Sequence, residues 1–256
     1  MPRNTAHIAD GRYDLAQEPA LVRFAALGLD GAAAATGLSD AVARAYPVRA
    51  RRELTSEGRA IAEPRLLLRG WAARVRLLPD GRRQFMSFLV PGDLIGMNAQ
   101  PQPLAAATVI AVTDVVACRP PSIDDAPALA DTYAVSAALD EAYLLAQITR
   151  LGRLNAQERI ADLLLELHER LTLNGMAQGD AFELPLTQEV LADALGLTSV
   201  HVNRMVQQAR RDGDLQWKGG RVTLTDPVAL ARKIGRIPPR VSAMQDAASV
   251  ATSPTA

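Results

Sequence analysis

One face of a helix predicted over residues 198–211 carries side chains suited to recognition chemistry. At about 100° per residue, this face presents Ser199, Val200, Asn203, Arg204, Gln207 and Arg211. Amide and guanidinium groups make paired hydrogen bonds to base edges in the DNA major groove, and apolar groups pack on thymine methyl groups. The segment between Thr198 and Arg211 contains no acidic residue, which suits approach to phosphates. We therefore expect this face to read double-stranded DNA.

Residues 188–207 have the residue sizes that a helix-turn-helix requires. Apolar residues stand where two short helices would pack on each other and on a core: Leu191, Leu195, Leu197, Val202 and Met205. Gly196 stands at the turn, where a positive φ costs glycine little. Thr198 can cap the second helix by accepting from a backbone N–H of its first turn. An ordinary helical hairpin with a solvated outer face is the alternative interpretation of this segment.

The residues after this segment favour a winged helix over a plain hairpin. Two short apolar runs flank Lys218 and two glycines, which predicts a β-hairpin, and Asp226 with Pro227 can open a last helix through Ile234. Lys218 and Arg221 at this hairpin suit phosphate contacts. The complete set of candidate DNA-binding residues is Thr187, Thr198, Ser199, Val200, His201, Asn203, Arg204, Gln207, Arg211, Lys218 and Arg221.

Composition excludes several classes of function. The 256 residues carry 28 Lys and Arg against 28 Asp and Glu, so any nucleic-acid footprint must be local. The single Cys118 excludes an internal disulfide framework and an all-cysteine iron–sulfur cluster. His7, His168 and His201 have no ligand spacing, and no nucleophile or phosphate-binding motif is present. We expect no metal, no cofactor and no enzymatic activity.

The segment before the candidate site predicts an effector-like β domain. Residues 1–18 are polar and read as a flexible extension without a signal-peptide core, and no run approaches the about 18 apolar residues of a membrane span. We expect a cytoplasmic protein. Short strand-like runs at 65–69, 72–77, 84–90, 108–111 and 115–118 predict a compact β-sandwich or roll within residues 19–126.

Residues 127–154 predict one long helix, for which we favour a role in a homodimer. The predicted interface residues are Tyr133, Ala137, Leu144, Ile148 and Leu151, and the alternative is a helix that lies on its own β domain. Asn155 and Glu158 form a capping-box pattern, which places a hinge at Asn155 and a new helix through residue 171. The winged-helix domain then occupies residues 155–235, and residues 236–256 read as a disordered tail.

In this order of parts the chain resembles the Crp/Fnr family of bacterial transcription regulators. The resemblance covers about residues 21–235 and is carried by LTQEVLADALGLTSVHVNRMV (186–206), NAQERIADLLLEL (155–167), LLLRGWA (66–72) and VPGDLIG (90–96). It implies an α+β chain with an N-terminal β-roll similar to a cyclic-nucleotide-binding domain, a long dimerisation helix and a C-terminal winged helix-turn-helix. Implied partners are DNA, a second copy, RNA polymerase and a small-molecule effector, with no membrane.

The residues implied for the effector pocket depart from the family members that bind cyclic AMP. Met97 stands where those members place a glutamate for the ribose, and Ala105 and Ala106 stand where they place an Arg-Ser pair for the cyclic phosphate. A buried phosphate without its arginine loses charge-assisted hydrogen bonds. We therefore expect an effector other than cyclic AMP, or none.

The reading residues also depart from the best-known members of the family. Those members place Arg-Glu at the start of the second helix, where this chain has Ser199 and Val200, whereas the later arginine is kept as Arg204. Valine cannot accept a hydrogen bond from a cytosine amino group. The best-known members of the family bind half-sites with the sequence TGTGA or TTGAT. We expect the half-site of this chain to differ from both at the base facing Val200. The competing hypothesis is a ligand-binding or protein-interaction module that has lost DNA binding.

Overall fold

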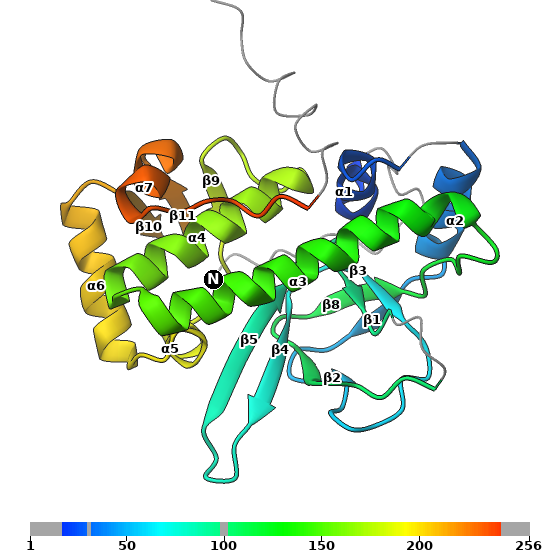
Figure 1. Cartoon of the computed structure of the whole chain (residues 1–256), viewed down its shortest axis with the longest axis horizontal. Helices are drawn as coiled ribbons and strands as arrows, with labels where there is room; N and C mark the ends of the chain where they lie inside the picture. The colour runs from blue at the N-terminus through cyan, green and yellow to red at the C-terminus, as the bar shows by residue number, and fades with distance from the viewer. Residues whose placement is uncertain (1–16, 30–31, 98–101, 242–256) are drawn as a thin grey trace, which may run out of the picture.

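The computed structural model describes residues 17–29, 32–97 and 102–241, which form a β-roll, a long helix and a winged helix in that order (Figure 1). Two helices, α1 (Pro19–Ala26) and α2 (Ala32–Val42), precede the β-roll. The strands of the roll are β1 (Tyr46–Val48), β2 (Glu53–Thr55), β3 (Arg65–Arg69), β4 (Ala72–Leu77), β5 (Arg83–Leu89), β6 (Leu94–Ile95), β7 (Thr108–Ala111) and β8 (Val115–Cys118).

The β-roll consists of two antiparallel sheets, with strand orders β1-β8-β3-β6 and β2-β7-β4-β5. Side chains from both sheets share one buried core that includes Leu54, Leu67, Leu89 and Val109. The five strands expected from the sequence are present, although β5 lies one residue earlier than predicted. The strands β1, β2 and β6 went unpredicted because two or three residues are too few to show alternation.

The long helix α3 (Ala130–Arg153) follows a short 3₁₀ turn, η2 (Pro127–Leu129), and links the two ends of the molecule (Figure 1). One side of α3 packs on its own β-roll, where Arg74 of β4 donates to both carboxylate oxygens of Asp140 at 2.7 Å. Tyr133 is 4% exposed, stacks edge-on against Phe24 and donates its hydroxyl to the Pro121 carbonyl. The expectation that Tyr133 lies on a dimer face was wrong, because its ring fills the core of its own chain.

The winged-helix half contains α4 (Ala156–Leu173), β9 (Ala181–Glu183), α5 (Gln188–Leu195), α6 (Ser199–Arg211), β10 (Leu215–Lys218), β11 (Arg221–Leu224) and α7 (Pro227–Ile234). The three strands form an antiparallel sheet in the order β10-β11-β9. Leu164, Leu195, Val202 and Val222 are at most 1% exposed and belong to a common core. The helix α4 therefore supports α5, α6, α7 and β9 together.

A mostly buried network of eight charged side chains joins the two halves. Four arginines (Arg23, Arg150, Arg170 and Arg236) balance four acids (Asp93, Asp162, Glu166 and Glu169). Asp93, in the turn between β5 and β6, accepts from Arg23 of α1 and from Arg170 of α4, both at 2.5 Å. Gly92 beside it has φ 93°, and a Cβ there would lie 2.7 Å from the Arg23 side chain. Glycine thus permits the close approach of α1 to this turn.

The network continues from the β-roll through α4 into α3 and the end of the chain. Glu166 of α4 accepts from Arg170 at 3.3 Å and from Arg150 of α3 at 2.5 Å. Arg150 also reaches Asp162 at 2.7 Å, and Asp162 accepts from Arg236 at 2.6 Å. Arg236 was expected to begin a disordered tail, but its side chain is 2% exposed. That expectation is wrong for the side chain of Arg236, and residues 242–256 lie outside the described residues.

Asp93 gives the fold a predictable response to acid. Burial by itself raises the pKa of Asp93, but Arg170 and Arg23 hold it below its ordinary value of 3.8. A carboxyl whose pKa is lower in the folded state contributes stability that is present above the unfolded pKa and is lost as pH falls through the folded pKa. Asp93→Asn should therefore lower the free energy of unfolding at pH 7 by about 3–5 kcal/mol, because two arginines lose a buried partner.

The same variant should also show a smaller loss of stability between pH 5 and pH 3, as measured by denaturant unfolding. The control is Asp131→Asn, which replaces an exposed carboxylate in the first turn of α3. Equal acid sensitivity in Asp93→Asn and the unmodified protein would contradict the assignment of Asp93 as a paired, ionised group.

Candidate nucleic-acid interface

The helices α5 and α6 are each started by a threonine cap. The Thr187 hydroxyl accepts from the Val190 amide and the Thr198 hydroxyl accepts from the His201 amide, both at 3.2 Å. Between the helices, Gly196 adopts a left-handed conformation with φ 63° and ends α5. The turn and the cap predicted from the sequence are confirmed. They set the angle at which α6 leaves α5.

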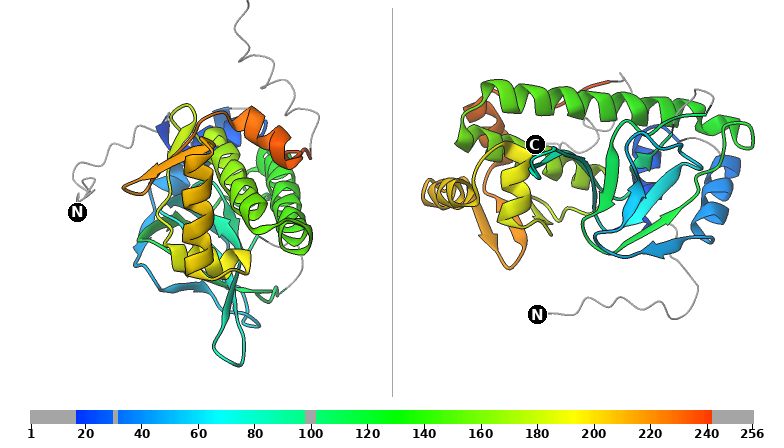
Figure 2. Two further views of the ribbon diagram at one scale, coloured as in Figure 1. Left: turned by 90° about the vertical axis from the view of Figure 1, so that its left-hand side faces the viewer. Right: turned by 90° about the horizontal axis from the view of Figure 1, so that it is seen from below.

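The helix α6 has one buried face and one open face. Val202, Val206 and Ala209 are buried in the winged-helix core, and Met205 packs beside them at half-buried depth. On the opposite side, the Val200 side chain is 80% exposed, and Ser199, Asn203, Arg204, Gln207 and Arg211 are also exposed. Figure 2 shows α6 in golden yellow at the front of its left-hand view, with no ribbon in front of it. The predicted reading face is therefore accessible in the free chain.

The hydrogen bonds on this open face are few and are made by exposed side chains. Asn203 donates to Gln188 at 3.2 Å, which brings the start of α5 beside the face of α6. Arg211 donates to Gln208 at 2.6 Å, and Arg210 donates to Gln207 at 3.2 Å. In the described part of the chain, Arg204 makes no hydrogen bond or ion pair. The guanidinium group at the centre of the face is thus available to a ligand.

The two candidate residues of the wing differ in their surroundings. Lys218 at the end of β10 is exposed. Arg221 at the start of β11 donates to Glu183 of β9 at 3.2 Å and to Gln178 at 2.8 Å. The contact with Glu183 was not predicted, because only the pairing of β11 with β9 brings Arg221 and Glu183 together. Lys218 therefore offers the freer positive charge for a phosphate.

The carboxyl end of α5 is held by side chains from three other elements. The Ala194 carbonyl accepts from Gln84 of β5 at 3.2 Å and from Gln147 of α3 at 2.7 Å. The Leu195 carbonyl accepts from Arg159 of α4 at 2.9 Å. These donors satisfy carbonyl groups that a helix end leaves unpaired. None of the three donors was predicted, because each lies far from its acceptor along the chain.

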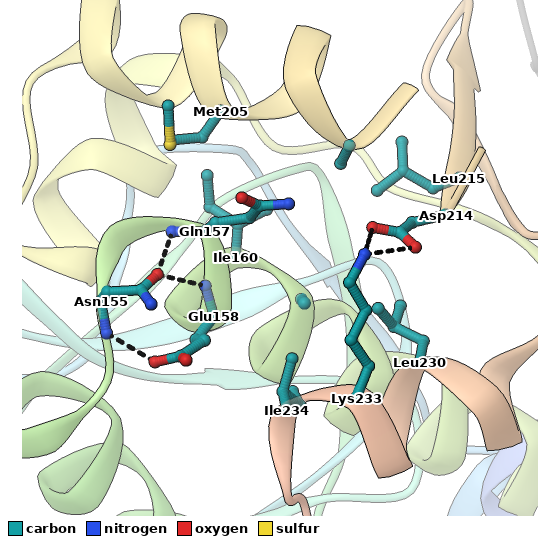
Figure 3. Close-up of a pocket in the computed structure, with 12 residues that line it drawn as sticks. Asn155, Gln157, Glu158, Ile160, Met205, Asp214, Leu215, Leu230, Lys233 and Ile234 are labelled. Atoms are coloured by element: carbon teal, nitrogen blue, oxygen red, sulfur yellow. Dashed lines mark hydrogen bonds and ion pairs between the residues drawn. The ribbon is translucent and has the colours of Figure 1, made fainter. Parts of the chain in front are cut away.

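The capping box predicted at Asn155 is present, and Figure 3 shows it at the start of α4. The Asn155 side chain accepts from the amides of Gln157 at 3.0 Å and Glu158 at 3.1 Å, and the Glu158 carboxylate accepts from the Asn155 amide at 2.8 Å. A cavity of 150 Å³ lies between this cap, Met205 of α6 and Ile234 of α7 (Figure 3). The start of α4 thus lies close to the buried side of α6.

A cavity of 380 Å³ lies between the β-roll and α3, and Met97, Ala105 and Ala106 all line it. The structure therefore brings together the three residues assigned to the effector pocket. Two arginines of β4 also line this cavity, but both are already paired. Arg74 binds Asp140, and Arg76 donates to Glu57 at 2.8 Å and to the Ala106 carbonyl at 3.2 Å.

Residues 17–29, 32–97 and 102–241 contain no group of three or more His, Cys, Asp or Glu side chains placed to hold a metal ion. Burial raises the pKa of the Cys118 thiol to about 12. None of the helices in the described ranges has the length and apolar character needed to cross a membrane.

Two family models match the two halves of the chain. A cyclic nucleotide-binding domain matches residues 47–124, and a Crp-like helix-turn-helix domain matches residues 158–233. The nitrogen fixation regulation protein FixK of Bradyrhizobium diazoefficiens is 34% identical over 166 residues, which cover 63% of this chain and 69% of FixK. The transcriptional activator protein FnrL of Cereibacter sphaeroides is 34% identical over 177 residues, which cover 65% of this chain and 70% of FnrL.

Solved structures show the same arrangement. FixK2 from Bradyrhizobium japonicum superposes with a TM-score of 0.63 at 25% identity, over 78% of this chain and 98% of FixK2. A CRP-family transcriptional regulator from Thermus thermophilus has a TM-score of 0.59 at 24% identity, over 77% of this chain and 100% of that chain. The second match shows the fold alone.

Proposed function

Since the chain belongs to the Crp/Fnr family of transcriptional regulators, we propose that it acts as a homodimer whose two α6 helices read paired DNA half-sites. The observation that supports this most directly is the open face of α6, where Arg204 is exposed on a helix that contains no acidic residue. Arginine at such a position makes the commonest specific contact with DNA, to guanine O6 and N7. Lys218 and the capped start of α5 at Thr187 are placed for phosphate contacts.

A seam of mostly exposed residues along α3 supports the homodimer. Its residues follow alternating steps of four and three, which is the spacing of a two-helix coiled coil: Ala134, Ala138, Glu141, Leu145, Ile148 and Gly152. Leu145 is 57% exposed and Ile148 is 67% exposed. A second α3 would cover this apolar surface and remove it from water.

This seam differs from the interface predicted from the sequence alone. Ile148 belongs to both sets, and Ala137 is exposed beside the seam. Leu144 lines the 380 Å³ cavity, and Leu151 approaches the turn at Gly196, where a Cβ would lie 3.8 Å from the leucine side chain. Both leucines are half-buried within their own chain. The proposed interface therefore lies on a face of α3 that is shifted around the helix, by about one residue, from the face predicted from the sequence.

We propose that a small-molecule effector binds in the 380 Å³ cavity between the β-roll and α3. The cavity contacts both the roll and the helix that would carry the dimer, so an occupant could favour one arrangement of the two. Ala105 and Ala106 offer no side-chain donor to a cyclic phosphate, and Arg74 is committed to Asp140. The proposed effector is therefore a molecule other than cyclic AMP.

The DNA-binding proposal predicts a loss of affinity on Arg204→Ala. Removal of one bidentate guanine contact should weaken binding to the selected site by about 10- to 100-fold, since such a contact contributes about 1–3 kcal/mol. Fluorescence anisotropy at several salt concentrations measures this change. The control is Arg52→Ala, which removes an exposed arginine from the distant β-roll. Equal affinity of Arg204→Ala and the control would contradict reading by α6, and no salt-dependent binding by the unmodified protein would favour a module that does not bind DNA.

The base facing position 200 provides a separate prediction. Selection of bound sequences from a random DNA pool should yield half-sites that differ from TGTGA and TTGAT at this base, because Val200 offers only an apolar surface. The Val200→Glu variant should shift the selected base toward cytosine, whose amino group donates to a carboxylate. Recovery of an unchanged TGTGA or TTGAT box with the unmodified protein would refute the prediction.

The seam on α3 predicts a monomer on Leu145→Glu. Two leucines would be lost from each dimer, and each contributes about 1.5–3 kcal/mol when buried, so the dimer dissociation constant should rise by at least about a hundredfold. Analytical ultracentrifugation across a concentration series measures this constant. The control is Leu77→Glu, which makes the same change at a leucine that is 68% exposed in β4. A dissociation constant for Leu145→Glu equal to that of Leu77→Glu would rule out the α3 seam as the dimer interface.

A further inference from the structure

One carboxylate on α4 is shared between the long helix and the end of the winged helix. Asp162 accepts from Arg150 Nε through Oδ2 at 2.7 Å and from Arg236 Nη1 through Oδ1 at 2.6 Å. Arg150 lies on α3, and Arg236 directly follows Gly235, which ends α7. Because each oxygen serves a different element, Asp162 fixes the positions of both elements relative to α4.

Arg236 has a second anchor on the same helix. Its Nε and Nη2 donate to the two carboxylate oxygens of Glu169 at 3.1 Å and 2.7 Å. The Arg236 side chain is 2% exposed, whereas Asp162 and Glu169 are 10% and 31% exposed. A two-point contact of this kind fixes direction as well as distance. The backbone that follows α7 is thus bound firmly to α4.

Residues 236–241, which we name the C-terminal strap, continue from this anchor across α4. Figure 1 shows the strap in red, running from α7 over α4 toward α1. Val241 at its described end packs against Leu27, Leu139 and Tyr143, which belong to the α1 and α3 side of the molecule. Pro238 and Pro239 restrict the backbone between the two contacts. The strap therefore adds a further connection between the winged helix and the α1 and α3 side, separate from the chain link at Asn155 and from the pairing of Asp93 with Arg170.

The two winged-helix domains of a dimer, which we call the reading heads, must keep a defined separation when both bind one DNA duplex. This separation is about 34 Å for half-sites one helical turn apart. The helices α6 and α7 share a core with α4, so the position of α4 relative to α3 sets the position of each reading face. Rotation of α4 about Asn155 would separate Asp162 from Arg150, and release of the strap would remove the contacts that link α7 to the α1 and α3 side. Head separation is therefore sensitive to the strap.

We propose that Arg236 is a positioning residue, which holds the C-terminal strap on Asp162 and Glu169 and thereby sets the head orientation needed to grip two half-sites at once. This inference rests on the proposed homodimer that reads paired half-sites. Arg236 acts through head geometry and not through contact with DNA, so its removal should affect paired sites and spare single ones.

The test compares the affinities of the unmodified protein and Arg236→Ala for duplexes that carry two half-sites or one, using the sequence obtained by selection. Linkage of two binding modules raises affinity by about 10²- to 10⁴-fold when both can engage, and this gain is lost when geometry prevents it. Arg236→Ala should reduce the paired-site advantage by at least about tenfold, with single-site affinity unchanged within about twofold. Arg236→Lys keeps the positive charge but loses the two-point contact of the guanidinium group. Its paired-site advantage should lie between those of the unmodified protein and Arg236→Ala.

Two controls separate positioning from a loss of folding. Arg232→Ala removes an exposed arginine of α7 that donates to Val228 within its own helix, and should behave as the unmodified protein. Val241→Ser weakens the far contact of the strap without leaving a buried charge unpaired, and should reduce the paired-site advantage in the same direction as Arg236→Ala.

Each outcome has a distinct meaning. An unchanged paired-site advantage in both Arg236→Ala and Val241→Ser overturns the inference. An equal loss on paired and single sites also overturns it, because it shows a purely structural role. Absence of any paired-site advantage in the unmodified protein refutes the proposed dimeric reading itself, and so is distinguishable from failure of the strap.

Discussion

The constraint on which the structure depends is the pairing of charges buried around α4. Asp93 on the β-roll, Arg150 on α3 and Arg236 after α7 all reach this one helix, directly or through one partner. Replacement of one member leaves an uncompensated charge in a poorly hydrated site, which costs about 3–5 kcal/mol. A small movement of α4 would break several of these contacts together. The network therefore ties the position of the winged helix to the β-roll and α3.

The same kind of long-range contact fixes the position of the winged helix. The carboxyl end of α5 is held by Gln84, Gln147 and Arg159, which come from β5, α3 and α4. On the other side of the winged helix, the strap binds α7 to α4. The winged helix is thus held at the end of α5 and at the end of α7, and α6 remains uncovered (Figure 2). In this geometry the free chain already presents Val200 and Arg204 outward.

The cavity proposed for an effector differs in its charges from the proposed reading face of α6. Its arginines are bound to Asp140 and Glu57, whereas Arg204 on α6 is exposed without a partner in the described residues. A ligand in the cavity would meet charges that are already neutralised, and DNA would meet charge that is not. Within the β-roll, the pairing of Arg74 with Asp140 therefore helps to hold α3 in place.

The sequence by itself determined the elements whose signals are local. The caps at Thr198 and Asn155, the turn at Gly196 and five of the eight strands of the roll depend on short-range spacing and side-chain type. The reading face of α6 followed from helical periodicity. Tertiary structure alone decided which side of α3 is free, because Tyr133 is covered by Phe24 from a distant helix. It also decided the position of Arg236, whose polar surroundings in sequence resemble a loose tail, while its two acidic partners lie 67 and 74 positions earlier. Contacts at such separations arise from the packing of complete elements, and no local pattern encodes them.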